Sequence, residues 1–160
     1  MSIENKRLWF RRYKNQINII KRLEDRLESI EKRIPSTHFA PSAGTGLPLR
    51  RSSTTENDLI EDKLETEARI QRAKDKARFI RRELQEVIDS IENVNLSEVL
   101  EYRYIEILEP DEIAEVIGYT PRHIMRLLSQ ALEEVEIPGL EDSETTGRLT
   151  ALNHVKSLEP

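Results

Sequence analysis

The sequence predicts an all-α protein, in which a long N-terminal antiparallel helical hairpin is followed by a module of three short helices. Charged residues make up 34% of the 160 residues, aromatic residues make up 5%, and only five residues are glycine. Such a composition is typical of helix-rich proteins and argues against a sandwich or an α/β sheet. Two long stretches also repeat apolar residues at steps of three and four, which is the spacing of one face of a helix.

The composition also narrows the functions that the chain can have. The absence of cysteine excludes disulfides, thiolate zinc sites and cysteine nucleophiles. The three histidines are scattered, and no serine lies in a nucleophile-elbow context, so we expect no metal site, no cofactor and no catalysis. No apolar run is long enough to span a membrane, and charged residues occupy the N-terminus where a signal peptide would be apolar. We therefore expect a cytoplasmic protein.

Residues 3–34 are expected to form the first arm of the hairpin. They contain neither proline nor glycine, and Pro35 follows directly. The apolar residues of the second half of this arm form a coiled-coil seam: Ile20, Leu23, Leu27, Ile30 and Ile34. An aromatic stripe that begins at Trp9 and Phe10 extends the seam towards the N-terminus, and so large a group of rings is expected to pack on more than a single helix.

A mobile loop is expected at 35–55, where proline, glycine, serine and threonine cluster without periodicity. The second arm is expected to begin after Thr54 or Thr55 and to run to about Asn93. Its seam keeps the same alternation of steps: Ile70, Ala73, Ala77, Ile80, Leu84, Val87, Ile91 and Val94. Helices of this length need a partner face, and the two seams can pair as an antiparallel hairpin within one chain or between two chains.

Three short helices are expected next, over residues 96–108, 110–117 and 121–135. Asn95 with Glu98 caps the first helix, and Pro110 fits the first position of the second. Thr120 followed by Pro121 opens the third. The remainder is expected to be a flexible tail. The predicted domains are therefore a hairpin at 1–94, a three-helix module at 95–135 and a tail at 136–160.

The segment PDEIAEVIGYTPRHIMRLLS, residues 110–129, carries the pattern of a helix-turn-helix. This motif needs apolar and small residues on its first helix, a glycine at the turn and apolar anchors at helical spacing on its second helix. All of these places are filled by residues of the right class: Ile113, Ala114, Ile117, Gly118, Tyr119, Ile124 and Leu127. The pattern predicts a DNA-binding unit whose second helix, 121–135, enters the major groove.

The outward side of this second helix, near its N-terminus, holds the expected contacts with double-stranded DNA. These residues are Thr120, Pro121, Arg122, His123, Met125, Arg126 and Ser129. Arg122 and Arg126 lie one turn apart and are candidates to read guanine bases. Thr120 and the first amides of the helix suit a phosphate, and His123 suits a phosphate or a base. Arg11, Arg12 and Lys14 are candidates for further phosphate contacts.

Residues 96–135 resemble region four, the C-terminal DNA-binding region, of bacterial sigma factors. The resemblance follows Val99-Leu100, Arg103-Tyr104, Asp111-Glu112-Ile113-Ala114, Gly118 and Ala131-Leu132. The whole layout is similar to the sigma-like phage and prophage regulators of the ArpU and RinA type in Gram-positive bacteria. This resemblance implies a transcription regulator at a phage promoter, and it adds RNA polymerase as a candidate partner. The chain shows no −10-binding region, so we do not expect a complete sigma factor.

Two other functions compete with transcription regulation. One is a phage DNA-packaging protein like a small terminase, which would assemble as a ring of eight or more subunits; a monomer or dimer favours a regulator. The other is a structural coiled-coil protein.

The distribution of charge bears on whether the predicted module binds DNA. Residues 1–34 hold ten basic and five acidic residues, whereas 96–135 hold three basic and nine acidic residues. So acidic a module is expected to bind DNA only with support from a dimer, a basic hairpin or RNA polymerase.

Overall fold

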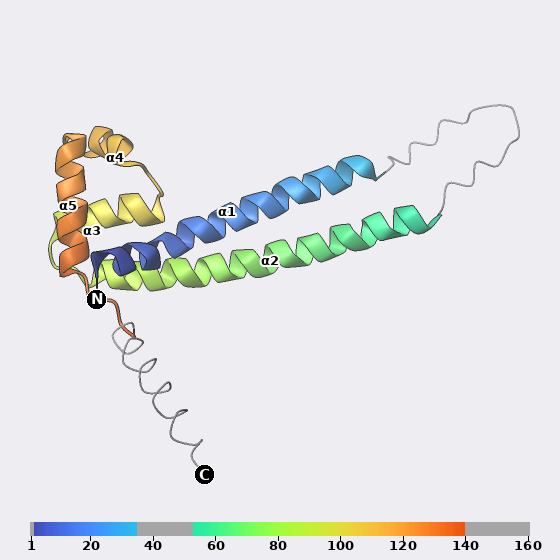
Figure 1. The fold of residues 1–160 in the computed structure, drawn as a ribbon, viewed down its shortest axis with the longest axis horizontal. Coiled ribbons are helices and arrows are strands. Elements are labelled where there is room, and N and C mark those ends of the chain that lie inside the picture. Colours follow the sequence, from blue (N-terminus) through green and yellow to red (C-terminus); the bar gives the residue numbers. More distant parts are fainter. Residues whose placement is uncertain (1, 35–52, 140–160) are drawn as a thin grey trace, which may run out of the picture. The chain divides into compact units, whose positions relative to one another are not determined.

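The computed structural model describes residues 2–34 and 53–139, and these residues are helical without any strand (Figure 1). The all-α prediction is therefore confirmed for this part of the chain. The elements are α1 (Ile3–Arg33), α2 (Ser53–Asp89), α3 (Val94–Leu100), a π-helical segment (Glu101–Ile105), α4 (Pro110–Ile117) and α5 (Pro121–Glu134). The predicted loop at 35–55 and tail at 136–160 fall mostly outside the described residues, although α2 already includes 53–55.

The chain forms two compact units, and each long helix contributes to both of them. One unit comprises residues 14–80, and the other comprises 1–13 together with the chain from 81 onwards. This division differs from the expected domains 1–94 and 95–135. The reason is that the first three turns of α1 and the last turns of α2 pack with the short helices.

In the unit of residues 14–80, α1 and α2 run antiparallel. Three ion pairs connect the two helices: Lys74 to Glu24 at 2.8 Å, Arg26 to Asp62 at 2.9 Å and Lys63 to Glu31 at 2.9 Å. Between them lie the buried apolar residues Ile20, Ile30, Ile70, Ala73, Ala77 and Ile80. Two polar side chains, Gln16 and Thr66, are also buried, and the Gln16 amide donates a hydrogen bond to the Ala73 carbonyl at 3.1 Å.

In the other unit, the N-terminal part of α1 contributes both to the core and to a helix cap. Phe10 is completely buried and its ring stacks on that of Tyr104, with 4.9 Å between the ring centroids. The Lys6 ammonium donates hydrogen bonds to the carbonyls of Glu133 at 3.1 Å and Val135 at 2.6 Å, at the C-terminal end of α5. A cation is favourable there because it satisfies the last carbonyls of a helix.

The connection between α2 and α3 differs from the sequence prediction. Helix α2 ends at Asp89, and Val94, which was expected in the seam, is 74% exposed. Asn93, not Asn95, is the N-cap of α3, because its side-chain oxygen accepts a hydrogen bond from the Asn95 amide at 3.1 Å. Ile88 was not part of the predicted seam, but it is buried in the structure and only 1% exposed.

The helix expected at 96–108 is also shorter and less regular than predicted. After Leu100 the backbone becomes π-helical, and Ile107 has a φ of 62°, a region that β-branched residues rarely adopt. The Arg103 guanidinium holds this bend, because it donates a hydrogen bond to the Leu108 carbonyl at 2.9 Å and pairs with Glu109 at 3.0 Å. A spacing of apolar residues does not reveal such a side-chain contact with the backbone.

Candidate functional site

A tight turn between α4 and α5 fixes where the candidate site begins. Gly118 has a φ of 82°, and its amide donates to the Ala114 carbonyl at 2.9 Å, as does the Tyr119 amide at 3.1 Å. Thr120 then adopts an extended conformation and caps α5, since its hydroxyl accepts from the His123 amide at 3.3 Å. The sequence thus sets both the end of one helix and the start of the next within three residues.

The inward face of α5 is closely packed. Five of its residues are buried: Ile124, Leu127, Leu128, Ala131 and Leu132. On α4, Ile113 and the small Ala114 are buried as well. Tyr119 is an exception among the predicted anchors, because it is 43% exposed and its ring meets the edge of His123 at 4.7 Å between centroids. It follows the left-handed turn at Gly118 and lies outside the core.

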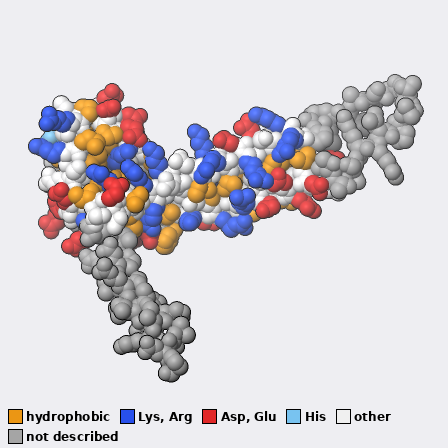
Figure 2. Space-filling view, viewed as in Figure 1, with side chains coloured by type: hydrophobic (Ala, Val, Ile, Leu, Met, Phe, Trp, Pro, Cys, Tyr) orange, Lys and Arg blue, Asp and Glu red, His pale blue; other side chains and the backbone are white. Residues whose placement is uncertain are grey.

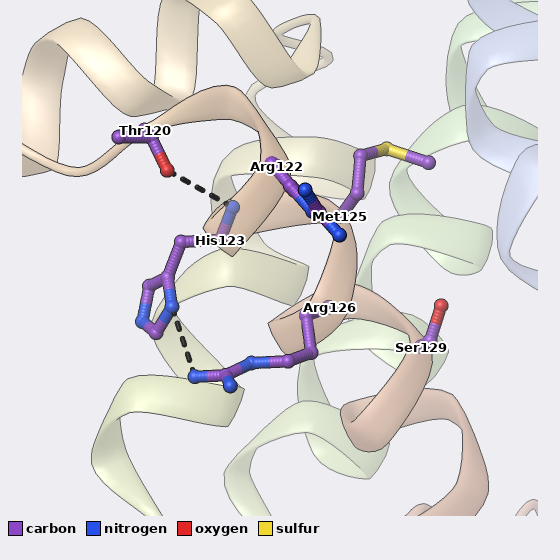
Figure 3. A pocket seen from close by; sticks show the side chains of 6 residues that line it. All are labelled: Thr120, Arg122, His123, Met125, Arg126 and Ser129. Atoms are coloured by element: carbon purple, nitrogen blue, oxygen red, sulfur yellow. Dashed lines mark hydrogen bonds between the residues drawn. The ribbon is translucent and has the colours of Figure 1, made fainter.

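The outward face carries the predicted contact residues. An open hollow of about 600 Å³ is lined by six of the seven: Thr120, Arg122, His123, Met125, Arg126 and Ser129. Figure 3 shows His123 and the Arg126 guanidinium on one side of α5 and Met125 on the other. Pro121 is exposed beside them at the first position of the helix, but it does not line the hollow.

Positive charge dominates this end of α5. Arg122 is exposed and has no hydrogen-bond or ion-pair partner among residues 2–34 and 53–139. Arg126 contacts only the His123 ring there, with 3.0 Å between its Nη2 and the histidine Nδ1, so His123 accepts at Nδ1 in this arrangement. The acidic residues of α5, Glu133 and Glu134, lie at its other end. In Figure 2, Lys and Arg side chains gather beside a histidine at the edge of the molecule.

The three basic residues suggested for phosphate contacts differ in their availability. Arg11 is exposed. Arg12 is occupied, because it pairs with Glu83 at 3.0 Å, donates to the Trp9 carbonyl at 3.0 Å and lies 4.4 Å over the Trp9 ring. Lys14 also has an interaction of its own. Arg11 is therefore the best placed of the three to contact a ligand.

Sequence reasoning missed two contributions to this unit. The first is the Tyr119 ring, whose contact with His123 orients one of the outward side chains. The second is Lys6, which caps α5 from a position 127 residues earlier in the chain. The basic character of the first turns of α1 was a signal, but it suggested a DNA contact and not a helix cap.

Among the residues that the structure describes, no cluster of three or more histidine or acidic side chains is arranged to hold a metal ion. No helix in the described ranges combines the length and apolar character needed to cross a bilayer. Comparison of the chain with protein-family models, with curated proteins and with solved structures finds no significant match.

Proposed function

We propose that this protein is a sequence-specific DNA-binding transcription regulator, in which α4 and α5 act as a helix-turn-helix and α5 reads the major groove. The observation that carries this proposal is the two-sided character of α5. Its inward face is anchored by buried apolar residues, whereas its outward N-terminal turns expose Arg122, Arg126 and the cap residue Thr120. A recognition helix needs this combination, because its N-terminal residues contact base edges while its buried face anchors it to the rest of the module.

The chemistry of the outward face suits a DNA duplex. A guanidinium can donate two hydrogen bonds to the O6 and N7 atoms of a guanine, which is the commonest specific contact in the major groove. Arg122 is available for such a contact as it stands. Arg126 would exchange its contact with His123 for one with a base or a phosphate. The amides at the start of α5 and the Thr120 hydroxyl suit a phosphate group.

The remainder of the chain supports this function in two ways. Residues 1–13, which belong to the same compact unit as α5, add four basic residues and one acidic residue. They offset part of the negative charge of 96–135, which would otherwise repel DNA. The paired long helices would form a coiled-coil-like hairpin arm, for which we propose a role in assembly. The similarity of the whole layout to phage and prophage regulators suggests phage or prophage promoters as targets, and the resemblance to sigma region four suggests RNA polymerase as a second partner.

Selection from a random pool of DNA duplexes tests the proposal directly. The full chain should enrich one sequence motif, and footprinting of the DNA that flanks its own gene should show protection at a match to that motif. Equal binding of all duplexes, or no binding at low salt, would overturn the proposal. Sedimentation of the same preparation addresses packaging, since a ring of eight or more subunits would favour that function over regulation.

A further inference from the structure

Six charged side chains form a continuous line along α2 within the unit of residues 14–80. Their positions step by three, four, four, three and four, so each lies next to the following one on the helix surface. All six are exposed. The first three are acidic and the last three are basic, and we call this line the charge stripe. Its members are Asp58, Glu61, Glu65, Arg69, Arg72 and Lys76.

The charge stripe differs from the other charges on the long helices. At several other places on these helices, opposite charges are interleaved and pair along one helix, as in Lys32 with Glu28 at 2.7 Å and Arg78 with Asp75. By contrast, none of the six members has an ion-pair partner within residues 2–34 and 53–139. Within each half of the stripe, like charges are neighbours, and such neighbours destabilise a helix. A segregated arrangement therefore costs stability in the single chain.

A second copy of the chain relieves this repulsion in one orientation only. If two stripes lie antiparallel and centred near residue 67, Asp58 faces Lys76 of the second copy. Glu61 then faces Arg72 of the second copy, and Glu65 faces Arg69 of the second copy. Two-fold symmetry repeats each pair, because a self-complementary surface satisfies both copies at once. Parallel stripes would instead set acid against acid and base against base.

Apolar side chains beside the stripe favour the same arrangement. Leu64 is 60% exposed, although it is a large apolar residue, and Ala68 follows it one turn later on the same side of α2. In the antiparallel register, Leu64 of one copy lies near the small Ala68 of the other, at the centre of the contact. Burial of Leu64 would then add an attraction that does not depend on salt.

We infer that the outward side of α2 is an antiparallel homodimer interface, in which the acidic half of the charge stripe pairs with the basic half of a second copy. The inference does not depend on DNA binding. Because exposed ion pairs are individually weak and screened by salt, the dimer should dissociate as ionic strength rises.

Charge reversal tests this interface in the full chain. The triple variant Asp58→Lys, Glu61→Lys, Glu65→Lys should weaken self-association at least about tenfold in sedimentation experiments at low salt, because each attractive pair becomes repulsive. The reciprocal triple Arg69→Glu, Arg72→Glu, Lys76→Glu should do the same. An equimolar mixture of the two variants should form a heterodimer, since acid then faces base again. Circular dichroism confirms that the variants remain helical.

A matched control separates the stripe from net charge. The triple Glu86→Lys, Glu92→Lys, Glu115→Lys changes the net charge by the same amount at exposed positions outside the stripe, and it should leave the dimer intact. Equal weakening by this control would overturn the inference. So would a parent chain that stays monomeric at about 100 μM in low salt, or stripe variants that change only the binding of DNA duplexes.

Cross-linking tests the orientation, and the absence of cysteine from the chain makes it simple. Ala68→Cys lies next to the two-fold axis, so oxidation should join two copies. Lys76→Cys should not cross-link with itself, because in the antiparallel dimer the two positions are separated by about 27 Å along the helices. Efficient self-cross-linking of Lys76→Cys would indicate parallel helices and would contradict the proposed register.

Discussion

At the scale of single residues, local chemistry determines where α5 begins. Gly118, Thr120 and Pro121 could be recognised in the sequence because a left-handed turn, a side-chain cap and a fixed φ each depend on one residue and its neighbours. The contact of Tyr119 with His123 and the cap that Lys6 provides could not be predicted. Both contacts depend on the three-dimensional arrangement of the chain, in one case across a tight turn and in the other between distant segments, and a local sequence pattern does not predict either.

Gly118→Ala should therefore destabilise the chain by about 1 kcal/mol, because alanine disfavours the left-handed conformation. The added methyl group meets no atom within 4 Å, so the cost is that of the backbone alone. Gly118→Asn should cost less, since asparagine tolerates this conformation. Urea denaturation of the three proteins measures the difference. An alanine variant as stable as the parent would show that the turn does not need glycine.

At the scale of elements, apolar spacing predicted the long helices well and their ends poorly. Steps of three and four identify a buried face, and most of the predicted seam of α2 is indeed buried. The spacing misplaced the end of α2 because Val94 continues the pattern by coincidence while Asn93 starts a new helix. It also missed Thr66, which is only 1% exposed, because a polar residue gives no signal in an apolar pattern.

Leu84→Asp should destabilise the protein by more than about 3 kcal/mol, since Leu84 is completely buried and an unpaired charge in an apolar core is strongly unfavourable. Phe79→Asp is the matched control on the same helix, because Phe79 is 60% exposed. It should change stability by less than about 0.5 kcal/mol. Thermal melts followed by circular dichroism distinguish the two, and equal melting temperatures would contradict the packing of α2.

At the scale of the whole molecule, one of the two compact units does not correspond to a continuous stretch of the sequence. The sequence suggested a DNA-binding module confined to 95–135, because the caps and the turn of that region follow one another closely. Phe10 and Lys6 belong to the same unit as α5. The aromatic stripe did predict packing on more than a single helix, and Phe10 stacks on Tyr104, but neither segment indicated which helices meet. If the antiparallel dimer forms, its two-fold symmetry predicts a DNA site made of two inverted half-sites.

Phe10→Ala should destabilise the unit that contains α5 by about 3–5 kcal/mol, because a fully buried aromatic side chain leaves a large cavity when it is removed. The exposed Leu8 on the same helix supplies the control, and Leu8→Ala should have little effect. Hydrogen exchange of the α5 amides follows this unit specifically. Unchanged protection in the Phe10 variant would show that α5 is stable without α1.

The central claim is that Arg122 and Arg126 read bases, and titration of the selected duplex and a scrambled duplex at several salt concentrations tests it most directly. Arg122→Ala or Arg126→Ala should cost about 1–3 kcal/mol on the selected duplex and reduce the preference over the scrambled one. Arg82→Ala, which removes one exposed positive charge from α2, should leave that preference unchanged. If both α5 variants discriminate between the duplexes as well as the parent does, α5 is not the recognition helix.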